Sequence, residues 1–331
     1  MVKIMIEDNE AGQRLDRFLK KYYNQAPLSA IYKMIRKDVK LNGKRAAQET
    51  MLSAGDEITV YITDEQHEAF HRAKEIRRSR KSFRIAYEDE NILIAEKPFG
   101  LLTHGDEHEK KNHLTNQVIS YLIDRGEYRP GQAKTFTPSP ANRLDRNTTG
   151  LVLFGKTAGA LRAANRMIRE EGCVSKYYLT VVAGHMAEPL KLRDRMEKDS
   201  FRNTVRVLAE SADAGKLMET NAVPLAYGRL GGEEFTLVEV ELITGRTHQI
   251  RAHLAKAGYP VIGDTKYGRR RVNEIVGRRY HLTTQLLHAY RLEFLRGEDE
   301  LAYLTGKTVK CMLPPDMAEI VRDLFGQETD I

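Results

Sequence analysis

The sequence predicts an α+β protein with a mixed, largely antiparallel central sheet and flanking helices, preceded by a small N-terminal α/β unit. Apolar, strand-like segments recur through residues 85–322 with helical segments between them. Their spacing lacks the regular period of about 30 residues that a doubly wound parallel fold shows. Residues 1–66 carry a separate helix and strand pattern, and 331 residues exceed one average domain.

The composition is that of a folded protein with a basic surplus. Hydrophobic residues make up 41% and charged residues 30%, which argues against wholesale disorder. No run approaches the roughly 18 to 20 apolar residues of a membrane span, and the first residues lack the apolar core of a signal peptide, so we expect a cytoplasmic protein without a membrane partner. Cys173 and Cys311 form no C-x-x-C pair and are expected to be reduced thiols. The net charge of +7 suggests a polyanionic partner.

The first unit, residues 1–66, is predicted to be a helix–helix–hairpin. Apolar side chains recur at i, i+3, i+4 and i+7 through residues 15–22, which predicts one buried helical face. Ser29 is the expected N-cap of a second helix. Residues 39–44 read as a strand that enters an Asn-Gly turn, and residues 57–62 as its partner.

The surface of this unit is expected to be strongly basic. Positions 13–45 hold ten Lys or Arg and two Asp, and the apolar positions must take up the core. A basic exterior of this kind is suited to phosphate contacts, although a merely solvated charged face is the ordinary alternative. The candidate RNA contacts are Arg14, Arg17, Lys33, Arg36, Lys37, Lys40 and Lys44.

Residues 67–84 have almost no apolar content and are predicted to be a basic linker, or an ordered strap on RNA. The unit at 85–322 follows, and residues 323–331 are expected to be a loose tail. Its clearest predicted elements are strands at 92–95, 151–154, 175–182 and 235–243, and helices at 158–169 and 248–256.

The sharpest chemical signal is a polar loop that leads into an apolar strand. Asp145 lies between Arg143 and Arg146, and Gly150 begins the strand that follows. An aspartate among cations stays ionised because nearby positive charge favours the carboxylate, and an ionised aspartate is suited to nucleophilic attack. For this pattern taken alone, a surface ion pair is the commoner explanation.

A second polar junction lies where a strand turns at Gly245 into a helix, with Thr247 as its expected cap. Arg246 lies on this junction, from which its guanidinium can reach a carboxylate or a phosphate. His248 and His253 are five residues apart and do not share a helical face, which argues against a zinc site. We therefore expect no metal.

Tyr178 lies on the strand at 175–182 and shares a face with Thr180. A buried tyrosine is usually a core residue with a satisfied hydroxyl. In a nucleotide pocket, its ring can instead stack on a base or its hydroxyl can move a proton.

Together these segments resemble the RluA family of pseudouridine synthases. The family hallmark H-R-L-D-x-x-T-S-G is matched within residues 142–150 at five positions, and G-R-T-H-Q-I-R-x-H-L is intact at 245–254. Asn142 and Thr149 depart from the family's His and Ser, so hydrogen bonding in this loop is expected to differ. Further matches are Lys97-Pro98, Lys176-Tyr177-Tyr178, Gly263-Asp264-Thr265-Lys266-Tyr267-Gly268 and Leu287-His288-Ala289.

Residues 13–62 separately resemble the alpha-L RNA-binding motif, which also occurs in a small-subunit ribosomal protein. The match includes R-L-D-R-F-L at 14–19, V-x-L-N-G-K at 39–44 and the late Gly55-Asp56. Members of the RluA family with this domain typically act on large-subunit ribosomal RNA. The resemblance thus implies a monomeric enzyme whose partner is RNA, namely 23S ribosomal RNA.

The resemblance also implies the pseudouridine synthase fold, an isomerase activity and the roles of individual residues. The enzyme flips a uridine, breaks its glycosidic bond and rejoins the base through ring carbon 5, without a metal or a small-molecule cofactor. Asp145 acts on the nucleotide, and Arg246 pairs with it and aims it. Tyr178 packs on the base and helps remove the proton from carbon 5. Arg143 fills the vacated space or contacts the backbone, and Arg146 joins it in binding RNA.

Two other functions remain open at this point. A catalytically idle RNA-binding or ribosome-assembly factor would use the same basic surfaces, but it would have no need of Asp145, Tyr178 and Arg246 together. A metal-dependent nuclease would require clustered ligands, which the sequence does not show. The exact uridine is not given by the sequence.

Overall fold

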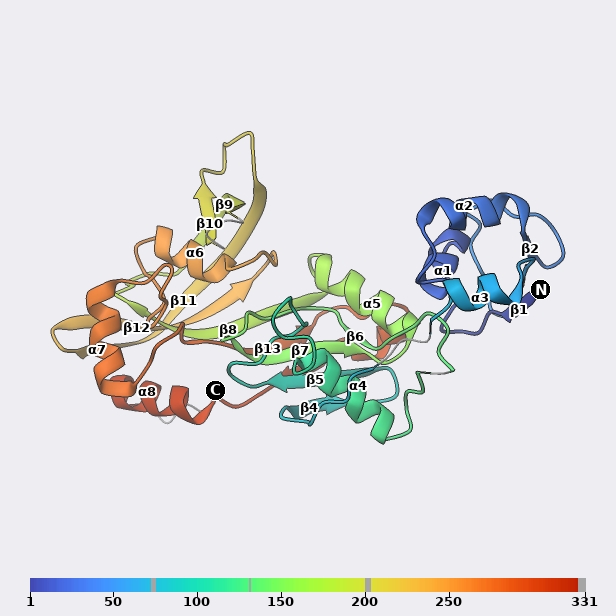
Figure 1. Ribbon diagram of the computed structural model, residues 1–331. Helices are drawn as coiled ribbons and strands as arrows, with labels where there is room; N and C mark the ends of the chain where they lie inside the picture. Colours follow the sequence, from blue (N-terminus) through green and yellow to red (C-terminus); the bar gives the residue numbers. More distant parts are fainter. Residues whose placement is uncertain (73–75, 131, 200–203, 327–331) are drawn as a thin grey trace.

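The computed structural model describes residues 1–72, 76–130, 132–199 and 204–326. A small N-terminal unit lies at one end of a long body that is built on one large sheet (Figure 1). Helices flank this sheet, and its pairings are antiparallel with one parallel exception among the described strands. The predicted mixed, largely antiparallel α+β fold is confirmed.

The N-terminal unit has its own three-stranded sheet and its own buried core. The predicted helix at 15–22 forms, with Phe18 and Leu19 fully buried. Asn42 and Gly43 both have positive φ, as the predicted Asn-Gly turn requires. Its elements are β1 Val2–Met5, α1 Leu15–Tyr22, α2 Leu28–Lys37, β2 Val39–Leu41, β3 Glu57–Val60 and α3 Asp64–Phe70, with strand order β1-β3-β2.

The second helix of this unit begins differently from the prediction. Ser29 lies inside α2, and the N-cap position is held by Pro27 without a side-chain cap. Proline fixes its own φ near −65° and has no N–H to satisfy, so the chain enters the helix directly after it. The assignment of Ser29 as the cap was wrong because this backbone constraint precedes it.

The segment after the unit is more ordered than a linker. Helix α3 runs across the predicted boundary between residues 66 and 67, and Thr63 and Gln66 form a capping box at its start. The ring of His71 stacks on that of Tyr22, with centroids 4.4 Å apart. Further along, Ser82 N donates to Gln117 Oε1 at 2.8 Å. The described part of residues 76–84 is therefore hydrogen-bonded to the unit at 85–322 through Ser79 and Ser82.

The large sheet contains eleven strands in the order β10-β9-β11-β12-β8-β13-β7-β5-β4, with β14 on β13 and β6 on β7. The strands are β4 Arg84–Glu88, β5 Ile92–Lys97, β6 Ser139–Pro140, β7 Thr149–Gly155, β8 Val174–Ala183, β9 Leu190–Asp199, β10 Thr204–Leu208, β11 Lys216–Leu230, β12 Glu233–Leu242, β13 Leu287–Phe294 and β14 Thr308–Lys310. The predicted strands at 92–95, 151–154, 175–182 and 235–243 correspond to β5, β7, β8 and β12.

Helices cover both faces of this sheet. The helices are α4 Leu114–Asp124, α5 Ala158–Arg169, α6 Gln249–Lys256, α7 Arg270–Tyr280, the 3-10 helix η1 Asp299–Leu304 and α8 Pro315–Phe325. One cluster joins α4 and α6 to the face that carries Tyr178, and a second packs α5 and η1 on the other face. A third joins α7 and α8 at the far end. Helix α8 extends into the predicted tail, whose last residues, 327–331, lie outside the described residues.

One part of the sheet projects away from the body, which we call the arm: β9, β10 and residues 216–222 of β11 (Figure 1). Met196, Val205 and Met218 of the arm pack on Ala252 of α6. No helix of the described residues is long and apolar enough to cross a membrane.

Candidate active site

A pocket of about 1180 Å³ opens between the loop before β7, strand β8, the start of α6 and the arm. Asp145, Tyr178, Arg246 and Arg143 all line it. These four residues lie on the three segments that the sequence analysis singled out, whereas the arm was not predicted, and one predicted pair is different, as described below.

The loop that carries Asp145 is fixed by a close approach of two strands. Gly150 has φ +114°, and a Cβ at this position would lie 2.1 Å from Ala289 O on β13. Only glycine fits this backbone. The parallel pairing of β7 with β13 begins here, so the loop is held directly at the sheet.

Asn142 and Thr149, the two residues that differ from the family hallmark, both form hydrogen bonds with neighbouring segments. Asn142 Oδ1 accepts from Leu153 N at 2.8 Å, which fastens the start of the loop to β7. Thr149 Oγ1 lies 2.7 Å from His288 Nδ1, inside the core. Burial lowers the pKa of His288 to about 4, so this ring is neutral. Both substitutions thus keep the loop anchored through side-chain hydrogen bonds.

A buried lysine on strand β5 forms hydrogen bonds that hold the loop of Asp145. Lys97 is 1% exposed, and its ammonium donates to Pro98 O, Leu101 O and Arg146 O at 3.2, 2.7 and 2.9 Å. Burial lowers the pKa of Lys97 to about 7, while Asp145 acts in the opposite direction. The bond to Arg146 O ties the residue next to Asp145 to strand β5.

The guanidinium that pairs with Asp145 belongs to Arg251. Arg251 Nη1 donates to Asp145 Oδ2 at 3.1 Å, and Nε and Nη2 bind Asp264 at 2.6 and 2.9 Å. Burial alone would raise the pKa of Asp264, but the hydrogen bonds and charge of Arg251 hold it below its usual value. The expected pair of Asp145 with Arg246 is therefore corrected.

Arg246 lies elsewhere on the pocket wall. Its side chain is exposed, and its Nε donates to Leu217 O at 3.2 Å, so it binds the arm. The physical reason is position, because Arg246 lies on the turn whereas Arg251 lies in the first turn of α6 and points inward. A charged residue between the buried Ile250 and Ala252 requires a partner, and that signal was present in the sequence.

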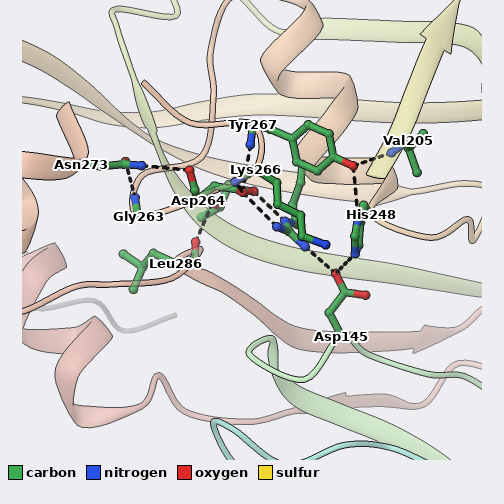
Figure 2. A network of polar contacts seen from close by, with 11 residues as sticks. Asp145, Val205, His248, Gly263, Asp264, Lys266, Tyr267, Asn273 and Leu286 are labelled. Atoms are coloured by element: carbon green, nitrogen blue, oxygen red, sulfur yellow. Dashed lines mark hydrogen bonds and ion pairs between the residues drawn. The ribbon is translucent and has the colours of Figure 1, made fainter. Parts of the chain in front are cut away.

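His248 forms a second, longer contact with Asp145. Its Nε2 lies 3.8 Å from Asp145 Oδ2, and its Nδ1 lies 3.1 Å from Tyr267 Oη (Figure 2). Burial lowers the pKa of His248 despite the opposing charge of Asp145, so the ring is neutral at pH 7. His248 has φ +52° and holds the N-cap position of α6, which corrects the expected Thr247 cap.

Tyr178 and Thr148 present the remaining polar groups. Tyr178 is 6% exposed, and burial, followed by the charge of Asp145, raises the pKa of its phenol. Thr148 is 2% exposed and also lines the pocket, and its hydroxyl has no hydrogen-bond partner among the described residues. A buried hydroxyl without a partner is costly, which is typical of a ligand-binding position.

Some of the candidate RNA-binding residues already have partners within the protein, and others do not. Arg143 is exposed on the pocket wall, whereas Arg146 lies 3.5 Å from Asp106. Arg14 is bound by Asp16 through two hydrogen bonds, and Lys40 lies over the ring of Tyr61. The exposed side chains that form no ion pair within the described ranges are Arg17, Lys33, Arg36, Lys37 and Lys44.

One cluster of the described residues has the composition of a metal site. Glu170, Cys173 and Glu298 lie together, and none of the three lines the pocket. The guanidinium of Arg296 lies among them, 3.2 Å from Cys173 Sγ and 3.0 Å from Glu298 Oε1. This arginine already supplies the positive charge that the carboxylates need.

Comparisons with known proteins identify related sequences along nearly the whole chain. Residues 91–256 match the family described as RNA pseudouridylate synthase. A relative named ribosomal large subunit pseudouridine synthase C from Escherichia coli (strain K12) is 34% identical over 325 residues, which cover 95% of this chain and 93% of the relative. The protein of that name from Pasteurella multocida is 31% identical over 339 residues, covering 98% and 94%.

Solved structures support the fold. Human RNA Pseudouridylate Synthase Domain Containing 1 superposes with a TM-score of 0.55 at 20% identity, and covers 78% of this chain and 94% of its own. Human RNA Pseudouridylate Synthase Domain Containing 4 gives a TM-score of 0.53 at 20% identity, covering 72% and 91%. At this identity the likeness concerns the fold alone.

Proposed function

The chain belongs to the RNA pseudouridylate synthase family and is an RNA pseudouridine synthase, and from this premise we propose that it isomerises uridine in large-subunit ribosomal RNA at the Asp145 pocket. The observation that carries the proposal is a carboxylate held by a buried guanidinium inside a pocket of about 1180 Å³. Relatives named for the ribosomal large subunit span nearly the whole chain, which supports this RNA as the substrate.

The reaction exchanges one bond of the nucleotide for another. The bond from ribose carbon 1 to ring nitrogen 1 breaks, the freed base turns, and ribose carbon 1 joins ring carbon 5. Carbon 5 loses its proton and nitrogen 1 gains one, so no external reactant is consumed. A stacked base is out of reach of the enzyme, so the uridine must be flipped into the pocket.

In this proposal, Asp145 acts on the flipped nucleotide and Arg251 keeps the carboxylate aimed. The guanidinium is itself fixed because Asp264 binds it from the opposite side. A preorganised charge of this kind acts without reorganisation during the reaction. Arg251 thereby takes the role that the sequence had assigned to Arg246.

Tyr178 is proposed to pack on the flipped uracil. Its raised pKa keeps the phenol neutral at pH 7, which disfavours a phenolate base and favours the stacking role. Thr148 is proposed to hydrogen-bond a polar group of the nucleotide, since its buried hydroxyl lacks a partner in the described protein. Hydrogen-bonding groups of this kind distinguish one base from another.

The basic residues are proposed to bind the RNA around the flipped nucleotide. Arg143 fills the space that the base leaves, Arg146 contacts the neighbouring backbone, and Arg246 contacts phosphate from the arm side. The unit at 1–66 is proposed to be an RNA-binding domain joined by the segment 67–84 to the catalytic domain at 85–322.

We propose that the enzyme acts as a monomer, and that it needs no small-molecule cofactor because the isomerisation consumes no external reactant. We place the enzyme in the cytoplasm, where bacterial ribosomal RNA is modified.

Tritium release from large-subunit RNA labelled at uridine carbon 5 tests the proposal. The wild-type protein is expected to release tritium, and Asp145→Ala is expected to release none while binding the RNA with unchanged affinity. Release by Asp145→Ala would overturn the assignment of this carboxylate. A wild-type protein that binds the RNA but releases no tritium would instead support an idle RNA-binding factor.

A further inference from the structure

The arm presents two uncompensated lysines to the active-site pocket. Lys198 and Lys216 both line the pocket, both are exposed, and neither forms an ion pair within the part of the chain that is described. In the strand register, Lys198 lies opposite Val205 and Lys216 lies opposite Met196. Directly opposed residues point to the same side of a sheet, so both lysines share the face that packs on α6.

The arm is also joined to the segment after α6 by a hydrogen bond from a backbone N–H to a tyrosine hydroxyl. Val205 N donates to Tyr267 Oη at 2.8 Å (Figure 2). Strand β10 is the edge of the sheet, and this N–H points away from its only neighbour, β9. The hydroxyl of Tyr267 therefore takes the donor that an edge strand leaves unpaired. Tyr267 belongs to the G-D-x-x-Y-G motif, whose Asp264 fixes Arg251 but whose tyrosine has no role in the proposed reaction.

This hydroxyl also reaches the catalytic carboxylate through one side chain. Because Tyr267 Oη accepts from Val205, its own proton can point to His248 Nδ1 at 3.1 Å. A neutral imidazole that accepts at Nδ1 carries its proton on Nε2. That proton then faces Asp145 Oδ2, at 3.8 Å from Nε2.

Tyr267 contacts the second support of Asp145 as well. Its backbone N donates to Asp264 Oδ1 at 3.1 Å, and the guanidinium carbon of Arg251 lies 5.4 Å from its ring centroid. A shift of this tyrosine would therefore disturb both groups that hold the carboxylate.

We propose that the arm binds the backbone of the substrate RNA through Lys198 and Lys216, and that Tyr267 is a positioning residue that couples the seating of the arm to Asp145 through His248. The proposal rests on the proposed function of the pocket. It predicts that the bond between Val205 N and Tyr267 Oη matters for turnover, although neither group contacts the reacting atoms.

Two substitutions break this bond from opposite sides. Tyr267→Phe removes the hydroxyl and keeps the ring, whereas Val205→Pro removes the N–H and is tolerated on an edge strand. Each is expected to lower kcat about tenfold, the value of one hydrogen bond, with KM changed less than about threefold. The double variant is expected to be no slower than Tyr267→Phe, because both changes remove the same link.

Val207→Pro is the matched control for the strand. Val207 lies two residues further along β10, so its N–H also points away from β9. It is expected to keep wild-type kcat. A kcat of Val205→Pro equal to that of Val207→Pro, with the wild type active, would overturn the coupling and leave the proposed function intact. A wild type without activity would instead count against the proposed function.

The proposed RNA contacts of Lys198 and Lys216 are tested by KM. The double variant Lys198→Gln and Lys216→Gln is expected to raise KM about tenfold and to flatten the salt dependence of RNA binding, with kcat nearly unchanged. Lys191→Gln is the control, since Lys191 lies on β9 outside the pocket lining. Equal KM values for both variants would overturn the RNA contact of the arm.

Discussion

Replacement of Arg251 by methionine separates its structural contribution from its catalytic one. Methionine keeps an unbranched apolar stem and removes the guanidinium, which leaves two carboxylates without their positive partner. The Asp264 side chain is 0% exposed, whereas that of Asp145 is 28% exposed and remains hydrated. Loss of one partner from a buried ion pair costs about 3–5 kcal/mol, so we expect Arg251→Met to lose about that much stability, mainly through Asp264.

A second substitution restores stability without restoring the catalytic pair. In the double variant Arg251→Met, Asp264→Asn, the buried carboxylate is replaced by a neutral amide. The amide oxygen can still accept from the backbone N–H groups of Lys266 and Tyr267, as the carboxylate does. We expect the double variant to recover at least about half of the lost stability, because no buried charge is left unpaired. Its activity should stay as low as that of Arg251→Met, since Asp145 has lost its partner in both.

Urea unfolding measures the stability of each variant, and single-turnover tritium release measures its activity. Arg246→Met is the matched control, and as an exposed residue it should change stability by less than about 0.5 kcal/mol and retain more activity than Arg251→Met. The reasoning is refuted if Arg246→Met is inactive while the Arg251→Met, Asp264→Asn protein is active. It is also refuted if Arg251→Met unfolds like the wild type.

Three other outcomes are expected. Lys97→Met leaves three carbonyl oxygens without their donor and should destabilise the protein by about 1–3 kcal/mol, measured by urea unfolding, with an added loss of activity because the loop of Asp145 loosens. Thr148→Val should lower kcat/KM for RNA about tenfold with unchanged thermal stability, and an unchanged kcat/KM would remove this hydroxyl from the nucleotide site. The pKa of Asp264 is lowered on folding, so its contribution is present above the unfolded value of 3.8 and is lost as pH falls through the folded value. The stability difference between wild type and Asp264→Asn should therefore narrow below about pH 4, and a constant difference would contradict this linkage.

The sequence predicted most of the pocket because its signals are local. Asp145 lies in a polar loop followed by an apolar strand, and the structure places this loop as that pattern required. The choice between Arg246 and Arg251 was harder, because both belong to the same motif. The apolar neighbours of Arg251 signal its burial, but its second partner, Asp264, lies thirteen residues beyond it, and periodicity does not report that contact.

Two of the elements that were not predicted, α7 and β9, have weak apolar patterns. Helix α7 has only two buried residues, Val272 and Val276, and four arginines. Most of the side chains of β9 are charged, because the arm projects from the body and has little core to bury. Their positions depend on contacts between distant segments, such as Val205 with Tyr267, which periodicity does not report.

The structure of residues 67–71 also depends on contacts with distant residues. Their polar composition predicted a linker, yet His71 stacks on Tyr22 and Thr63 caps the helix that precedes it. The rings of His67 and His71 pack on Tyr22 and Tyr23, and Phe70 packs on the core of the N-terminal unit. Composition alone therefore misplaced the end of the ordered N-terminal unit.

The central claim is tested most directly by pseudouridine mapping of large-subunit ribosomal RNA from cells that lack the gene and carry either the wild-type or the Asp145→Ala protein. We predict that specific pseudouridines disappear on deletion, return with the wild-type protein, and stay absent with Asp145→Ala at equal protein level. The return of those pseudouridines with Asp145→Ala, or an unchanged map on deletion, would contradict the account.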